Sequence, residues 1–192
     1  MKNEITQAFR ESADVKLRFI QENAEGVLQV VRMIVKAFKK GNKVLLFGNG
    51  GSAADAQHMA AEFVNRFLIE RPSLPAIALT TDTSILTSIA NDYEFADVFA
   101  KQVKALGREG DVAIGISTSG AAANVIKAVK VAGDLGIQTV GLTGKDGGEL
   151  ARVVDLALLV DSQSVPRIQE VHITIGHVVC EMVDRMLFQQ PG

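Results

Sequence analysis

The chain has 192 residues, of which 47% are hydrophobic and 22% charged, a composition typical of one globular domain with a sizeable core. Its formal net charge of −2 gives no reason to expect nucleic acid or an anionic membrane as a partner. The N-terminus has no signal-like apolar run, and no stretch approaches the roughly 18 apolar residues of a membrane span. The lone Cys180 cannot form an internal disulfide, which fits a reducing compartment, so we expect a cytoplasmic protein.

The beginning of the chain predicts a helical arm over residues 4–40. Apolar side chains recur there at the spacing of an amphipathic helix, densely between residues 27 and 38 and more loosely between residues 5 and 20. Gly41-Asn42 is a typical helix ending. An arm of this length either packs against another subunit or covers the core of its own chain.

Short apolar runs bounded by Gly, Asp, Asn or Ser then predict five strands, at 43–47, 75–79, 111–116, 137–142 and 155–160. Helical patterns lie between and after them, at 52–69, 83–105, 121–135, 147–153 and 166–188. Alternation of this kind is typical of a parallel sheet covered on both faces. We therefore expect a single domain over residues 1–192. Its core, at about 43–188, should be a three-layer α/β/α sandwich with five parallel strands, and the helical arm should be an N-terminal extension.

Two loops at the carboxyl ends of predicted strands point to a ligand. They are Gly48–Ser52 and Ser117–Gly120, and each combines backbone N–H groups with a following helix N-terminus, which attracts anions. Neither matches a Walker loop or a dinucleotide fingerprint. One such loop is equally well explained as a tight connection, whereas two in one sheet favour a phosphorylated ligand.

Two helices carry candidate catalytic or metal-binding side chains. His58 and Glu62 are four residues apart and share a helix face. Gln169 and His177 are eight apart, about 80° around a helix, so both can face one cleft. A His–Glu pair at this spacing is also common on solvated surfaces, and the apolar neighbours of His177 are equally those of a core histidine.

Longer segments carry a family resemblance. GNGGSAADAQHMAAE, IAND, GISTSG, LTGKDGG and RIQEVHITIGH resemble the phosphoheptose isomerases, a branch of the sugar isomerase (SIS) domain proteins, in family order and over nearly the whole chain. The resemblance implies a flavodoxin-like fold. It also implies an isomerase that converts sedoheptulose 7-phosphate to D-glycero-D-manno-heptose 7-phosphate for ADP-heptose, a precursor of lipopolysaccharide and other surface glycans.

The same resemblance implies roles for individual residues. Glu62 and His177 would be the acid/base pair, and one zinc ion per site would be held by His58, Glu62, Gln169 and His177. Phosphate would be bound by Ser117, Thr118 and Ser119. The sugar would be contacted by Asn49, Gly50, Gly51, Ser52, Glu62, Asn91, Asp92 and Gln169, with Arg66 nearby. A homotetramer with active sites at subunit interfaces is also implied.

These residue types suit the implied chemistry. A ketose–aldose shift moves a proton between C1 and C2 through a cis-enediol, which requires a base for the carbon-bound proton and a second group for the oxygen protons. Positive charge near the enediolate lowers its energy, and a metal ion supplies such charge. Histidine and glutamate are acceptable zinc ligands, and glutamine is a weaker one.

Two positions depart from the family pattern. Ala121-Ala122 stands where the phosphate loop usually continues Asn-Ser, which removes one hydroxyl. Pro166 stands where an Asp is usual, which removes a carboxylate from the expected cleft. Both changes bear on substrate affinity and specificity, and neither touches the acid/base pair.

A non-enzyme of the same branch is the main alternative. The initiator-associating protein of bacterial replication has similar stretches, NRF-x-x-ERPSLPAIAL and KQV-x-ALG. Its motifs lack the equivalents of Glu62 and His177 and have Arg where Ser119 stands, so the residues of this chain favour the isomerase. A sugar-sensing regulator is a third interpretation, and the absence of an attached DNA-binding segment argues against it.

Overall fold

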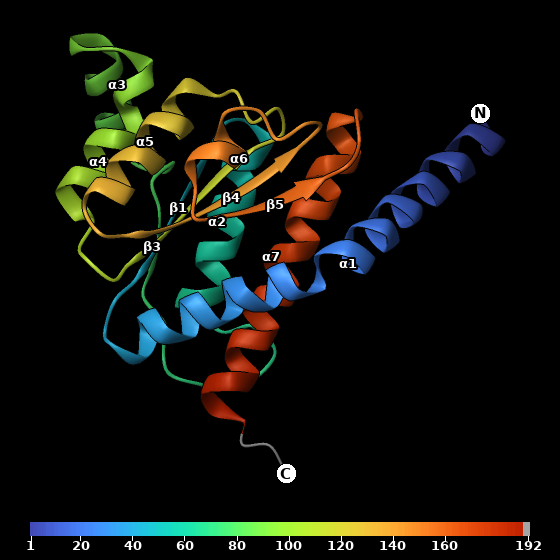
Figure 1. Ribbon diagram of the computed structural model, residues 1–192, viewed down its shortest axis with the longest axis horizontal. Coiled ribbons are helices and arrows are strands. Elements are labelled where there is room, and N and C mark those ends of the chain that lie inside the picture. The colour runs from blue at the N-terminus through green and yellow to red at the C-terminus, as the bar shows by residue number, and fades with distance from the viewer. Residues whose placement is uncertain (190–192) are drawn as a thin grey trace.

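Five parallel strands form the middle layer of the computed structural model, which describes residues 1–189 (Figure 1). The strands are β1 (Val44–Gly48), β2 (Ala76–Ala78), β3 (Val112–Ser117), β4 (Gln138–Gly144) and β5 (Leu156–Val160). Their order is β2-β1-β3-β4-β5, and every neighbouring pair is parallel. The predicted α/β/α sandwich with a five-stranded parallel sheet is confirmed.

Helices cover both faces of the sheet. They are α1 (Lys2–Lys39), α2 (Gly51–Val64), α3 (Thr83–Asp92), α4 (Val98–Leu106), α5 (Ala123–Asp134), α6 (Leu150–Val153) and α7 (Val165–Phe188), with a short 3₁₀ turn, η1 (Phe95–Asp97). Because side chains alternate along a strand, Val44 and Leu46 of β1 pack with α1, α2 and α7, while Leu45 and Phe47 pack with α4 and α5. These two apolar layers explain why the strands are apolar throughout.

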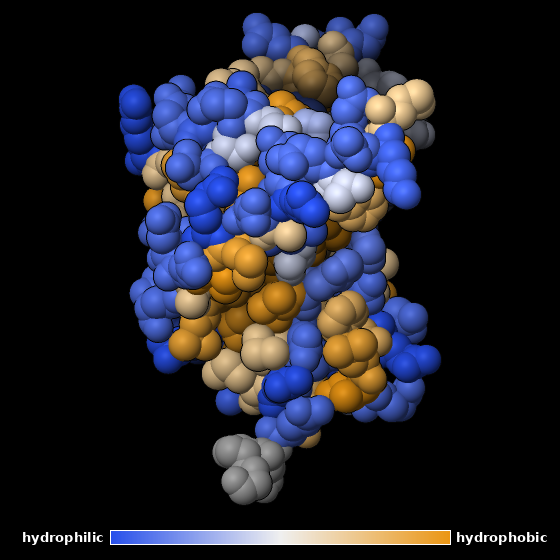
Figure 2. Space-filling view, turned by 90° about the vertical axis from the view of Figure 1, so that its right-hand side faces the viewer, coloured by the Kyte–Doolittle hydropathy of each residue, from blue (hydrophilic) through white to orange (hydrophobic). Residues whose placement is uncertain are grey.

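The predicted helical arm is present, and it is one continuous helix of 38 residues. Its second half is buried through Val27, Val31 and Ile34 and packs on α7, whereas its first half projects away from the sandwich (Figure 1). Figure 2 shows apolar side chains gathered on the side toward which α1 projects. An apolar hollow of about 200 Å³ lies between α1 and α7.

Three helices differ from their predicted bounds. The helix expected at 83–105 is interrupted at Tyr93-Glu94, because α4 turns an apolar stripe into the core while α3 buries no residue. The helix expected at 52–69 ends at Val64, where the Arg71 side chain takes up the carbonyl groups of the last turn. The segment 147–153 becomes helical only from Leu150, because two glycines in left-handed conformations precede it.

Within residues 1–189, none of the helices has both the length and the apolarity that crossing a bilayer requires.

Candidate active site

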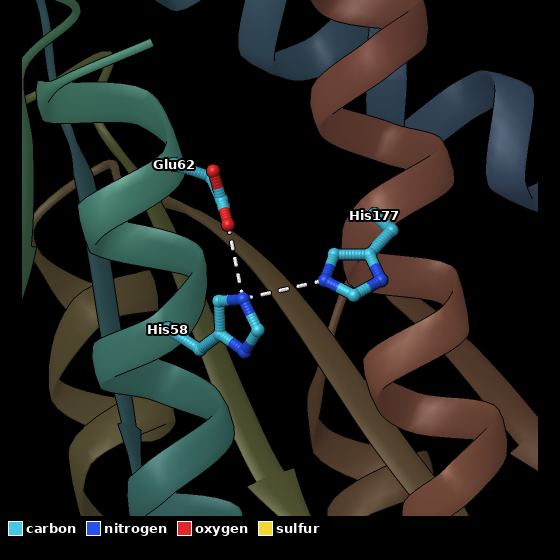
Figure 3. Close-up of side chains that lie close together, drawn as sticks. All are labelled: His58, Glu62 and His177. Carbon is cyan, nitrogen blue, oxygen red and sulfur yellow. Dashed lines mark hydrogen bonds and ion pairs between the residues drawn. The ribbon is translucent and has the colours of Figure 1, made fainter. Parts of the chain in front are cut away.

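Three side chains from two neighbouring helices, α2 and α7, point toward one another (Figure 3). His58 and Glu62 extend from α2, and His177 extends from the facing side of α7. His58 Nε2 lies 2.9 Å from Glu62 Oε1 and 3.4 Å from His177 Nε2. One nitrogen or oxygen of each side chain lies within 4.8 Å of the others. We call these three residues the His–Glu–His cluster.

The His–Glu–His cluster has the donor set of a divalent cation site. Two imidazole nitrogens and a carboxylate oxygen are ligands that zinc accepts at about 2.0–2.2 Å, which places tetrahedral ligands about 3.4 Å apart. The separations of 2.9 and 3.4 Å are close to that value. Two facing imidazole nitrogens also need a proton or a cation between them. The residues therefore fit the ion that the sequence suggested.

Gln169 lies away from the His–Glu–His cluster, toward the loop Gly48–Ser52, which we call the first glycine-rich loop. It is eight residues before His177 on α7, a rise of about 12 Å along the helix. Its side-chain amide lies against Gly51 so closely that a Cβ at Gly51 would overlap it. Gln169 thus connects α7 with the loop that opens α2.

We call residues Ser117–Gly120 the serine-rich loop. It begins as β3 ends, with Ser117 buried, Thr118 half-buried and Ser119 exposed. Gly120 has φ +65°, and a Cβ there would collide with the carbonyl oxygen of Gly147. The Leu150 amide also donates to Gly120 O at 2.9 Å. The loop after β4, from the LTGKDGG segment, therefore braces the serine-rich loop through direct backbone contact.

The helix that follows the serine-rich loop has no side-chain cap. Its N-cap residue is Ala122, and no side-chain oxygen accepts from the first turn of α5. Ser119 Oγ instead accepts from the Ala121 amide at 3.3 Å. Uncapped amides at a helix N-terminus attract an anion, and the adjacent hydroxyl groups supply further donors.

The first glycine-rich loop joins β1 to α2. Gly50 and Gly51 are exposed at its tip, and Ser52 is buried in the first turn of α2. The Asn49 side chain is exposed and exchanges two hydrogen bonds of 2.9 Å with the side chain of Asn124 in α5. The loop is therefore fixed to the helix that follows the serine-rich loop.

Comparison with known proteins decides the family. The SIS domain matches residues 8–144. A phosphoheptose isomerase from Aquifex aeolicus is 55% identical over 190 residues, which cover 99% of this chain and 100% of that protein. The chain belongs to the phosphoheptose isomerase family. The family predicted from the sequence is confirmed.

Other phosphoheptose isomerases are similar to this chain over nearly its full length. A relative from Thermodesulfovibrio yellowstonii is 53% identical over 192 residues, covering 100% of this chain and 96% of the relative. The solved phosphoheptose isomerase of Francisella tularensis has a TM-score of 0.92 at 39% identity, covering 95% of this chain and 97% of that one. As a member of this family, the chain is an isomerase.

Two predicted contact residues of this isomerase lie on the other face of the sheet from the cluster, and a third pairs with a surface carboxylate. Asn91 and Asp92 end the exposed helix α3, which belongs to the layer of α4 and α5 on the other face of the sheet (Figure 1). Their side chains bond each other, Asn91 Nδ2 to Asp92 Oδ1 at 2.8 Å. Arg66 lies beyond the end of α2 and pairs with exposed Glu70 at 3.6 Å.

The sequence did not point to Phe67, which forms one wall of the cluster. Its ring stacks on the His177 imidazole with 5.6 Å between centroids and 20° between planes. The contact restricts the orientation of the imidazole and excludes water from one of its faces. In the sequence, Phe67 stands out only as an apolar residue just beyond the end of a helix.

Nothing in the sequence indicated that Arg71 and Asp184 form a pair beside the site. Both are buried, and Arg71 Nε donates to Asp184 Oδ1 of α7 at 2.7 Å. Arg71 Nη2 donates to the backbone oxygen of Glu62 at 2.8 Å, and Nη1 donates to that of Phe63 at the same distance. One guanidinium thus fixes the last turn of α2, including Glu62, against the helix that carries His177.

Several further titratable groups lie near these helices. Burial raises the pKa of Asp55, one turn before His58, although the nearby imidazole opposes the shift. Burial lowers the pKa of His172 to about 4, so this histidine is neutral and its Nε2–H donates to Thr143 O at 3.1 Å. Burial, followed by the charge of Glu62, raises the pKa of Cys180, which stays a core thiol.

Proposed function

We propose that the chain interconverts sedoheptulose 7-phosphate and D-glycero-D-manno-heptose 7-phosphate. The observation that carries the proposal is the His–Glu–His cluster, which brings a carboxylate and two imidazoles within 4.8 Å in a family of isomerases. Its members combine a base, a second proton carrier and a cation site. The named relatives supply the substrate class.

The reaction requires two kinds of proton transfer. Glu62 takes the proton from C1 of the ketose and returns it to C2, which requires one carboxylate facing both carbons. His177 gives a proton to O2 as the enediol forms and takes one from O1 as the aldehyde forms. Its ring is held for this task by Phe67. Atoms and charge balance, because each proton removed is returned to the same sugar.

Zinc is the proposed cofactor; His58, Glu62 and His177 would hold it, and Gln169, whose side-chain amide lies against Gly51 in this structure, would have to turn toward them to be the fourth ligand. When bound, zinc supplies positive charge for the oxygens of the enediolate. The fit of the cluster separations to tetrahedral coordination supports this choice. Zinc analysis of protein purified without chelators or an affinity tag tests it, and a metal-free protein of full activity would contradict it.

The phosphate group is proposed to bind at Ser117, Thr118 and Ser119, before the uncapped N-terminus of α5. Asn49, Gly50, Gly51, Ser52, Asn91, Asp92 and Gln169 are proposed to contact the sugar, with Arg66 in support. A fixed spacing between the phosphate and the reacting carbons favours a seven-carbon substrate over fructose 6-phosphate. Comparing kcat/KM for the two sugars tests this selectivity.

A homotetramer with active sites at subunit interfaces is part of the proposal. Asn91 and Asp92 are on the opposite face from the His–Glu–His cluster, so a second copy is needed to unite the proposed contacts. The exposed apolar side chains of the first half of α1, such as Phe9 and Leu17, also suit burial between copies. Light scattering tests the assembly. We further propose that the enzyme is cytoplasmic and that its product is used for ADP-heptose synthesis.

The decisive experiment is incubation with sedoheptulose 7-phosphate and detection of the aldose. Glu62→Gln and His177→Gln should each lower kcat by about 10²–10⁴-fold, because each removes a proton carrier. Glu109→Gln is the matched control, since Glu109 is exposed in the connection before β3 and is not one of the proposed contacts. Near-normal turnover in both folded site variants would refute the proposed roles.

A further inference from the structure

A reciprocal amide pair joins the two ligand loops. Asn49 follows β1, and Asn124 is the second residue of α5, which follows the serine-rich loop. Each side chain donates from Nδ2 to the other's Oδ1 at 2.9 Å. Because β1 and β3 are neighbours in the sheet, the pair lies where the two loops come together.

The two partners differ in exposure. Asn124 is 4% exposed, whereas Asn49 is exposed. A reciprocal pair uses one N–H and one oxygen lone pair of each amide, so the second N–H and lone pair of Asn49 remain free on its open side. The buried amide therefore determines which way the exposed amide presents its donor and its acceptor.

The position of Asn124 argues against a local structural role. An asparagine near a helix N-terminus ordinarily bonds nearby backbone amides. Here the side chain bonds across 75 residues of sequence to the other loop. Leaving a buried amide without a partner costs about 1–3 kcal/mol, so the pairing is also favoured energetically.

We propose that Asn124 is a positioning residue of the isomerase site. It holds the Asn49 amide so that its free N–H and oxygen face the sugar, while the phosphate binds to the loop just before α5. It also fixes the spacing between the phosphate-binding and sugar-binding loops. This inference rests on the proposed function and adds a residue to that site.

A double-mutant cycle on the purified, intact chain tests the proposal. The variants are Asn124→Ala, Asn49→Ala and the double variant, each measured for kcat/KM with sedoheptulose 7-phosphate and for free energy of unfolding. Asn124→Ala should lower kcat/KM about 10- to 100-fold, because displacement of a substrate contact by about 1 Å has effects of that order. The double variant should be no worse than Asn49→Ala, because Asn124 acts through Asn49.

Two further measurements separate positioning from stability. Inhibition by inorganic phosphate should be unchanged in Asn124→Ala, because the serine and threonine hydroxyls remain. Asn23→Ala is the control, since the Asn23 amide donates within its own helix, to Phe19 O of α1, and its kcat/KM should match that of the unmodified chain.

The outcomes are distinguishable. Additive losses in the cycle, or an unchanged kcat/KM in a destabilised Asn124→Ala, would overturn the positioning role while leaving the isomerase intact. If the unmodified chain fails to turn over the sugar, the proposed function fails and the positioning role fails with it.

Discussion

Substituting Gly51 by alanine tests whether Gln169 works where the structure places it. Gly51 is the first residue of α2 and has no left-handed φ, so its backbone accepts alanine. The new Cβ would overlap the side-chain amide of Gln169, which is the far end of a flexible side chain. We therefore expect the amide to move while the fold stays.

The expected magnitudes differ for stability and activity. Alanine is favoured over glycine in a helix by up to about 1 kcal/mol, so the free energy of unfolding should be unchanged or slightly higher. Displacement of a substrate or metal contact by about 1 Å should lower kcat/KM about 10²-fold. Gly133→Ala is the matched control, because its Cβ on α5 meets open space and should leave activity intact.

The assay combines urea unfolding with turnover of sedoheptulose 7-phosphate. Gln169→Ala should reproduce the loss, and adding Gly51→Ala to it should cost little more. A stable Gly51→Ala with kcat/KM near that of the unmodified chain would show that Gln169 is not needed at this position. Loss of folding would instead show that Gln169 cannot yield.

Three other perturbations have defined outcomes. The free energy of unfolding should fall by about 3 kcal/mol as the pH drops from about 6.5 to 4, because His172 takes up a proton in the unfolded chain but is kept neutral by burial in the fold. In urea titrations at several pH values, His172→Gln should make this pH dependence weaker. Asp184→Ala should destabilise the fold by about 3–5 kcal/mol, because it leaves the buried Arg71 guanidinium without its carboxylate; a loss under about 1 kcal/mol in thermal unfolding would contradict this. Ala122→Ser should stabilise the chain by about 1 kcal/mol as a helix N-cap and lower KM for the sugar phosphate; higher stability with an unchanged KM would place the phosphate elsewhere.

The sheet was predictable because its strands are apolar on both faces. Runs such as 43–47 and 111–116 can only be buried throughout, which identifies a covered parallel sheet. The break between α3 and α4 was not predictable, because neither glycine nor proline marks Tyr93-Glu94. Tertiary packing of α4 decides it, and no local pattern reports that packing.

The candidate site shows the same division. The four-residue spacing of His58 and Glu62 was enough to place them on one face of a helix. The approach of His177 depends on how α7 packs against α2, which helix spacing does not give. Arg71 and Asp184 are 113 residues apart, and neither has a local signal of its partner.

The contact between the serine-rich loop and the loop after β4 has a consequence for ligand binding. Because backbone meets backbone at Gly120 and Gly147, and the buried Leu150 amide is bonded to Gly120 O, the loop has few alternative conformations. Binding of the proposed phosphate group would then cost little loop entropy, so its affinity would come mainly from the donors themselves. The hydrogen-exchange rate of the Leu150 amide is a built-in probe of this rigidity, and it should already be slow before any ligand is added.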